Sequence, residues 1–121
     1  MVRTTLAQAV GLARQYLAGM EPRWTHVRVV GQRAERLCRD SDVPEDVAAA
    51  AWLHDLGYAE QLAMTGFHPL DGARFLRSIG ADDLVTSLVA YHSGAAYEAE
   101  ERVKSRGVVC DGFRVILLVK R

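Results

Sequence analysis

The chain has 121 residues, of which half are hydrophobic and a quarter are charged, as expected for one globular domain with a substantial core. Its 15 Lys and Arg residues balance its 15 Asp and Glu residues, so no overall field favours nucleic acid or an anionic membrane. The N-terminus has no apolar signal core, and no stretch approaches the length of a transmembrane helix. Cys38 and Cys110 are far apart and form no CxxC pattern. These features predict a cytoplasmic protein with reduced thiols and without general nucleic-acid or membrane binding.

Two amphipathic helices are predicted in the first third of the chain. Thr4 or Thr5 can cap the first helix, whose apolar face repeats at helical spacing until Gly19 ends it. The second helix is predicted from about 23 to 39. His26 lies in its first turn, beside the apolar stripe, and is therefore placed at a helix end.

A third helix is predicted to begin near Pro44, to close at Gly57 and to end in the doublet His54-Asp55. Two residues can cap its start, Ser41 and Asp42. Its buried stripe follows the spacing i, i+3, i+4, i+7 and consists of Val47, Ala50, Ala51 and His54. The free carbonyls at the helix end favour a cation there. His54 and Asp55 can therefore reach one metal ion placed just beyond that end.

A fourth helix is predicted to start at His68-Pro69, with the proline in its first turn, and to stop at Gly80. It follows an irregular stretch from 58 to 66. Asp71, one turn after His68, is expected to orient the ring of His68 through a hydrogen bond.

A fifth helix is predicted after a cap at Asp82 or Asp83. It ends at His92, which terminates a buried stripe at the same spacing as His54 does. A sixth, polar helix is predicted from about 95 to 104.

The last residues, 107–121, differ in kind from the rest of the chain. Apolar, β-branched runs flank Asp111-Gly112, which favours a hairpin, although a helix is the alternative. The prediction is one all-α helical domain, residues 1–106, with a short irregular or β-hairpin tail, residues 107–121. Its fold class is a compact bundle of five to six helices.

All four histidines of the chain fall at predicted helix ends: His26, His54, His68 and His92. A single histidine on an apolar face is usually structural, but four in such positions beside an aspartate favour a metal site. Imidazole and carboxylate ligands together suit several divalent transition metals, so Fe, Mn, Zn, Co and Ni all remain open.

The order of these residues resembles the HD-domain superfamily of metal-dependent phosphohydrolases. The resemblance covers about residues 20–95. It rests on His26, then His54-Asp55 within Ala-Ala-Trp-Leu-His-Asp-Leu-Gly-Tyr, then His68-Pro-Leu-Asp-Gly-Ala-Arg, then Tyr-His92-Ser. The doublet alone is a weak signal, whereas the doublet in this context is specific.

The resemblance implies an all-α fold and a metal centre formed by His26, His54, Asp55 and a later aspartate. It also implies that His68 and His92 line the site, where they bind a second metal or contact the substrate phosphate. The only aspartate after His92 is Asp111, in the expected turn of the tail. Either Asp111 is the last metal ligand, or the chain lacks that ligand, as truncation or a shifted reading frame would cause.

The expected function is hydrolysis of a nucleotide or another small phosphoester by a metal-activated water. One or two ions are expected, with Asp55, His68 and His92 as catalytic residues. Arg74 is a candidate phosphate contact, and a solvated arginine is the equal alternative. The expected partner is a small phosphorylated substrate, and a homodimer is left open. Two other hypotheses are a degenerate HD domain that binds metal or ligand without turnover and a helical scaffold with structural histidines.

Overall fold

The computed structural model describes residues 4–92 of the chain. The predicted sixth helix, the predicted tail and Asp111 lie outside these residues. Within them the chain forms helices and no strands, which confirms the all-α prediction. The elements in order are α1 (Leu6–Leu17), α2 (Arg23–Ser41), α3 (Glu45–Leu53), the 3-10 helix η1 (Leu56–Tyr58), α4 (His68–Ser78) and α5 (Asp83–Ala90).

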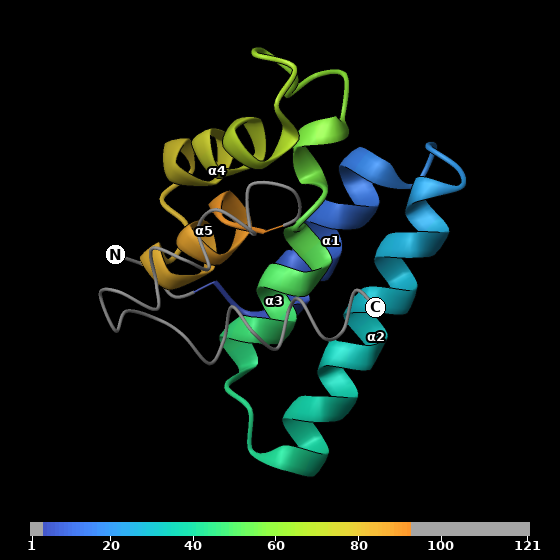
Figure 1. The fold of residues 1–121 in the computed structure, drawn as a ribbon, viewed down its shortest axis with the longest axis vertical. Helices are drawn as coiled ribbons and strands as arrows, with labels where there is room; N and C mark the ends of the chain where they lie inside the picture. The colour runs from blue at the N-terminus through green and yellow to red at the C-terminus, as the bar shows by residue number, and fades with distance from the viewer. Residues whose placement is uncertain (1–3, 93–121) are drawn as a thin grey trace.

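The short helix α3 lies at the centre of the bundle and packs against α1, α2 and α5 (Figure 1). Every residue from Val47 to Leu53 is buried. Four consecutive alanines in this stretch keep the helix thin, so three neighbours can approach it closely. The doublet His54-Asp55 follows directly, and the central position of α3 therefore carries it into the middle of the molecule.

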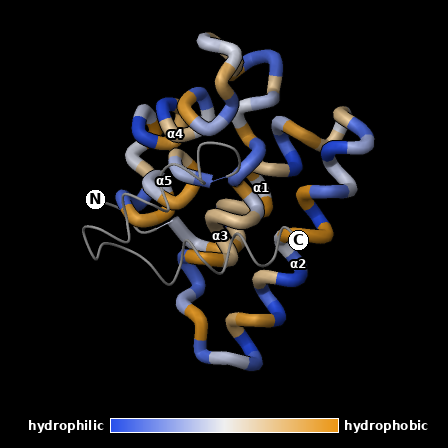
Figure 2. The backbone as a smooth tube through the Cα atoms, in the orientation of Figure 1, coloured by the Kyte–Doolittle hydropathy of each residue, from blue (hydrophilic) through white to orange (hydrophobic). Residues whose placement is uncertain are grey.

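The outer helices follow their apolar periodicity. Thr5 caps α1 in a capping box, in which Thr5 Oγ1 accepts from the Gln8 backbone and the Gln8 side chain accepts from the Thr5 backbone. In Figure 2, hydrophobic and hydrophilic residues follow one another along α2, as expected of a helix with one buried face. That buried face consists of Trp24, Val27, Val30, Gly31 and Ala34.

The predicted caps of α3 are wrong. Helix α2 continues past its predicted end, so Ser41 is its last residue and Asp42 is its C-cap in the left-handed conformation, with φ of 54°. A short polar side chain tolerates this conformation better than most residues do. Helix α3 then begins after Pro44 without a side-chain cap and ends at Leu53, ahead of Gly57.

Gly57 has a different role, because it brings η1 against α4. A Cβ atom at Gly57 would overlap the backbone of His68 and Gly72, and a Cβ at Gly72 would lie 3.2 Å from the Gly57 nitrogen. Only glycine permits two backbones to approach in this way. The contact places the residues after His54-Asp55 next to His68, at the start of α4.

The N-terminus of α5 is capped by Asp82, whose side chain accepts from the backbone of Leu84 at 2.8 Å. This resolves the predicted choice between Asp82 and Asp83. Among residues 4–92, no helix combines the length and the apolar character that crossing a membrane requires.

Candidate metal centre

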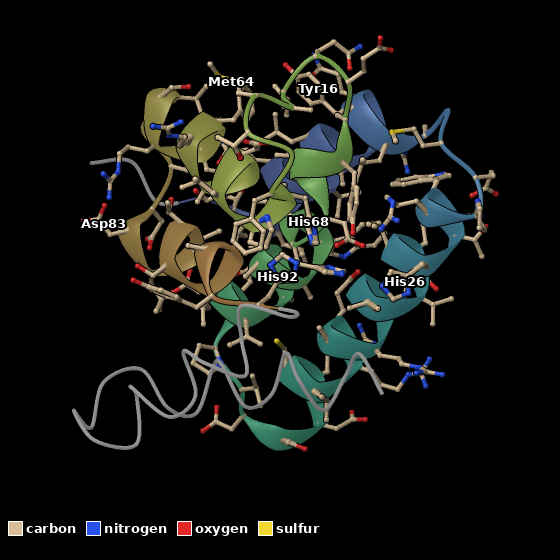
Figure 3. All side chains as sticks on the ribbon, turned by 45° about the horizontal axis from the view of Figure 1, so that its top comes forward. Tyr16, His26, Met64, His68, Asp83 and His92 are labelled. Atoms are coloured by element: carbon tan, nitrogen blue, oxygen red, sulfur yellow. The ribbon has the colours of Figure 1, made fainter. Side chains whose placement is uncertain are left out.

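The carboxylate of Asp55 lies at the point where four imidazole rings converge. Its Oδ2 atom is 3.3 Å from Nε2 of His54 and 3.7 Å from Nε2 of His26. Its Oδ1 atom is 3.3 Å from Nε2 of His68 and 3.5 Å from Nε2 of His92. Figure 3 shows three of these histidines coming from different parts of the chain: His26 from α2, His68 from α4 and His92 from the segment just after α5. The structure therefore brings together all four histidines of the chain.

Two of the rings are held by the helices that precede them. The Nδ1 atom of His54 lies 2.6 Å from the carbonyl of Ala51, and Nδ1 of His92 lies 2.5 Å from the carbonyl of Val89. A carbonyl only accepts, so Nδ1 carries the proton in both rings. In its neutral form, which is the form that binds a metal ion, each ring presents the lone pair of Nε2 to the centre. Metal-binding histidines are commonly oriented by this kind of hydrogen bond.

The Nε2 atom of His54 is the clearest sign that the centre is suited to a metal ion. This atom is completely buried and has no hydrogen-bond partner, since its 3.3 Å approach to Asp55 lacks hydrogen-bond geometry. An orphaned buried acceptor costs free energy unless a ligand satisfies it. A divalent metal accepts a lone pair from such a nitrogen and thereby satisfies it.

A second observation points the same way. The Nε2 atoms of His68 and His92 lie 3.0 Å apart. Two lone pairs repel each other at this distance, so a proton on one of the two rings or a cation must separate the nitrogens. The nitrogens and carboxylate oxygens form two sets of three that could hold a metal ion, and the sets share Asp55: His26, His54 and Asp55, and Asp55, His68 and His92.

The charge balance of the centre keeps Asp55 ionised. Burial alone would raise the pKa of this carboxyl group, but interactions with His54, His68 and His92 outweigh burial and hold the pKa well below its ordinary value. Arg23 adds a full positive charge, since its Nη1 atom donates to Oδ2 of Asp55 at 3.0 Å. Asp55 is therefore a permanent anion at neutral pH, as a metal ligand must be.

Two residues of the centre were missed from the sequence, Arg23 and Tyr58. The Arg23 guanidinium lies 3.4 Å from the centroid of the Tyr58 ring. The ring of Tyr58 stacks on that of His68, with centroids 3.9 Å apart and planes 20° apart. Arg23 could have been identified from the sequence by its position three residues before His26, because residues at this spacing lie on the same side of a helix.

No contact between the predicted phosphate contact, Arg74, and the centre is recorded among residues 4–92. Its side chain is exposed on α4, and the charge placed at Asp55 comes from Arg23. The proposed role of Asp71 as the partner of the His68 ring is wrong. Its carboxylate instead accepts hydrogen bonds from the backbone of residues 64–66 and from the Thr65 hydroxyl. These hydrogen bonds tie the loop of residues 64–66 to Asp71, in the first turn of α4.

A cavity of about 470 Å³ opens beside the centre. It lies at the turn that joins α1 to α2 and is lined by Met20, Glu21, Pro22, Arg23 and His26. Two of these residues, Arg23 and His26, also contact Asp55. The cavity therefore gives a small molecule access to the exposed side of the centre, where the His26 side chain is 42% exposed.

Comparison with known proteins agrees with this geometry. The family model of the HD domain matches residues 23–111, so the chain belongs to the HD domain family. The match begins at Arg23 and ends at Asp111, inside the predicted tail.

A tRNA (cytidine(56)-2'-O)-methyltransferase of Thermoplasma volcanium is 38% identical over 80 residues. The similar region makes up 65% of this chain and 23% of the methyltransferase, so the chain spans less than a quarter of this relative's length. No solved structure gives a significant match.

Proposed function

We propose that the chain is a metal-dependent phosphohydrolase that acts on a nucleotide or another small phosphoester. One observation carries the proposal: each oxygen of Asp55 faces its own pair of imidazole nitrogens within 3.7 Å. A carboxylate shared between two nitrogen pairs suits one or two divalent ions. Membership in the HD domain family supports the same chemistry.

His26, His54 and Asp55 would hold one ion, and Asp55, His68 and His92 the other. A metal in this centre supplies Lewis-acid chemistry, which lowers the pKa of water and offsets negative charge on a phosphate. The ligand chemistry is compatible with Fe, Mn, Zn, Co and Ni. Asp111 remains a proposed further ligand, because it lies outside the described residues.

The remaining groups suit a phosphoester. The Arg23 guanidinium presents planar, fixed donors next to Asp55, which is the geometry that recognises phosphate oxygens. The cavity beside Arg23 and His26 is large enough for a nucleotide-sized substrate. If a single ion binds, Nε2 of His68 is the proton donor for the leaving oxygen, since its side chain is 14% exposed and that of His92 is fully buried.

A second candidate is an HD domain that binds metal or ligand without turnover. The observation in its favour is the relative from Thermoplasma volcanium, whose stated activity is methyl transfer to tRNA. Only 23% of that enzyme is similar to this chain, so an HD-like region there accompanies a different reaction. On this alternative the chain is a regulatory or interaction module.

Hydrolysis of p-nitrophenyl phosphate and of a panel of nucleoside monophosphates separates the two candidates. The protein would be assayed after reconstitution with each of Mn²⁺, Fe²⁺, Co²⁺, Ni²⁺ and Zn²⁺. The proposal expects turnover that Asp55→Asn abolishes and that Asp40→Asn, an exposed aspartate on α2, leaves intact. Bound metal without turnover of any substrate would favour the binding module.

The variant Asp111→Asn tests the end of the family match. If Asp111 is a metal ligand, this variant binds metal more weakly than the wild type and loses turnover in parallel. Unchanged metal affinity would show that the centre closes without Asp111.

A further inference from the structure

We infer that Tyr58 is a positioning residue of the metal centre, whose ring holds the imidazole of His68 on one face and the guanidinium of Arg23 on the other. The expected effect of Tyr58 on hydrolysis rests on the proposed function. The positions of His68 and Arg23 on the Tyr58 ring rest on the geometry of the described residues and can be tested without turnover.

The two partners must lie on opposite faces of the Tyr58 ring. The His68 centroid is 3.9 Å from the Tyr58 centroid, and Cζ of Arg23 is 3.4 Å from it. Both distances are close to van der Waals contact with a ring face. Two groups at that height over one face would occupy the same space, so the ring is sandwiched between them.

The sandwich closes a cycle of contacts around Asp55. Arg23 donates to Oδ2 of Asp55 at 3.0 Å, and Nε2 of His68 lies 3.3 Å from Oδ1. The Tyr58 ring separates the guanidinium from the imidazole, so each group reaches a different oxygen of the carboxylate. A flexible arginine loses side-chain entropy when it is held, and stacking on an aromatic face compensates part of that cost.

Local sequence explains why the ring lies there. Tyr58 is the last residue of η1, and its backbone donates to the carbonyl of Asp55 at 3.0 Å. The 3-10 turn therefore fixes Tyr58 relative to Asp55. The contact between Gly57 and Gly72 brings this turn against α4. His68 is the first residue of α4, so the same contact presents its ring to Tyr58.

This arrangement gives Tyr58 a function that its phenol oxygen does not supply. The ring face fixes two groups, whereas the hydroxyl points to neither of them in any hydrogen bond recorded among residues 4–92. Tyr58→Phe should therefore behave as the wild type does. Tyr58→Leu keeps apolar volume but removes the flat face, and it should release both Arg23 and His68.

The matched control is Tyr16→Leu. The ring of Tyr16 packs edge-on against Phe75, with centroids 5.2 Å apart. Figure 3 shows Tyr16 well away from His68 and His92. The control therefore makes the same substitution at an aromatic pair that lies outside the centre.

The direct test is NMR spectroscopy of the full chain, with and without Zn²⁺. We expect nuclear Overhauser effects between the ring protons of Tyr58 and His68 in the wild type. We also expect the His68 ring protons to move downfield in Tyr58→Leu, because the ring current is lost, while those of His54 stay unchanged. Absence of the Overhauser effects in the wild type would overturn the inference even if the leucine variant did not fold.

Zn²⁺ titration calorimetry and hydrolysis of p-nitrophenyl phosphate give the functional consequence. Loss of a residue that orients metal ligands typically costs 10- to 100-fold in metal affinity or activity, and we expect roughly that loss in Tyr58→Leu. Tyr58→Phe and Tyr16→Leu should stay within about twofold of the wild type, on the same scale. Equal losses in the phenylalanine and leucine variants, or an unchanged leucine variant, would contradict the role of the ring face. If no sample hydrolyses the ester or any nucleotide of the panel, the proposed function fails, but the NMR and Zn²⁺ results still decide the inference.

Discussion

The imidazoles of His54 and His92 meet edge-on, with centroids 5.0 Å apart and planes 88° apart. The two residues follow different helices, α3 and α5, yet each ring binds the carbonyl three residues before it through Nδ1. Both side chains are fully buried. The same local hydrogen bond therefore orients both rings so that their Nε2 atoms face Asp55.

The first prediction concerns the choice between Arg23 and Arg74. If Arg23 holds the substrate phosphate, Arg23→Lys should raise KM for p-nitrophenyl phosphate about tenfold, because lysine lacks the planar, bidentate fork. Arg74→Lys should leave KM unchanged, since Arg74 is exposed on α4. The reverse pattern would restore Arg74 as the phosphate contact.

The second prediction concerns Asp71 and pH. Burial tends to raise the pKa of Asp71, but hydrogen bonds from Thr65, Met64 and Gly66 outweigh it and lower the pKa below its ordinary value. The unfolded chain therefore binds a proton more readily than the folded chain does. The ionised carboxylate contributes stability that is complete above the ordinary aspartate pKa, about 3.9, and is lost as the pH falls through the lower folded value.

Asp71→Asn should consequently lower the free energy of unfolding by about 2 kcal/mol at pH 7, the scale of hydrogen bonds to a charged group. The gap between variant and wild type should narrow as the pH falls below about 4. Urea unfolding at several pH values measures both effects, with Asp40→Asn as the exposed control. A gap that stays constant down to pH 2 would contradict the assigned role of the carboxylate.

The third prediction concerns the packing of α2 against α3. A Cβ atom at Gly31 would overlap the indole ring of Trp52, whose Nε1 donates to Glu35 at 2.8 Å. Gly31→Ala should therefore destabilise the protein by roughly 1–3 kcal/mol, the usual cost of overpacking.

The matched variant is Gly11→Ala on α1, where nothing lies within 4 Å of the added carbon. Alanine is the better helix former there, so this variant should stabilise the protein by about 0.5–1 kcal/mol. Thermal or urea unfolding compares the two. Equal effects at the two positions would show that Trp52 does not pack over Gly31.

The positions of the helices and of the histidines could be predicted because both depend on local periodicity. The spacing from Val47 to His54 and from Val85 to His92 indicated which side chains are buried at the ends of α3 and α5. The capping residues were less predictable. Ser41 and Asp42 have side chains that commonly cap the start of a helix, so they were expected at the start of α3. Instead, Ser41 is the last residue of α2 and Asp42 is its C-cap.

The parts of the centre that escaped prediction depend on contacts between elements. Tyr58 meets His68 only because Gly57 and Gly72 bring η1 and α4 together, and periodicity contains no information on that approach. Asp71 has helical spacing to His68 but turns to the loop of residues 64–66. In both cases the tertiary fold determined the partner.

Metal content of the purified protein is the most direct test of the centre. Elemental analysis of the wild type, Asp55→Asn and the control Asp40→Asn would be carried out after reconstitution and removal of free metal. We predict one or two equivalents of a divalent transition metal in the wild type and in Asp40→Asn, and loss of metal in Asp55→Asn. Absence of metal from all three proteins, or equal metal in Asp55→Asn, would contradict a centre built on Asp55.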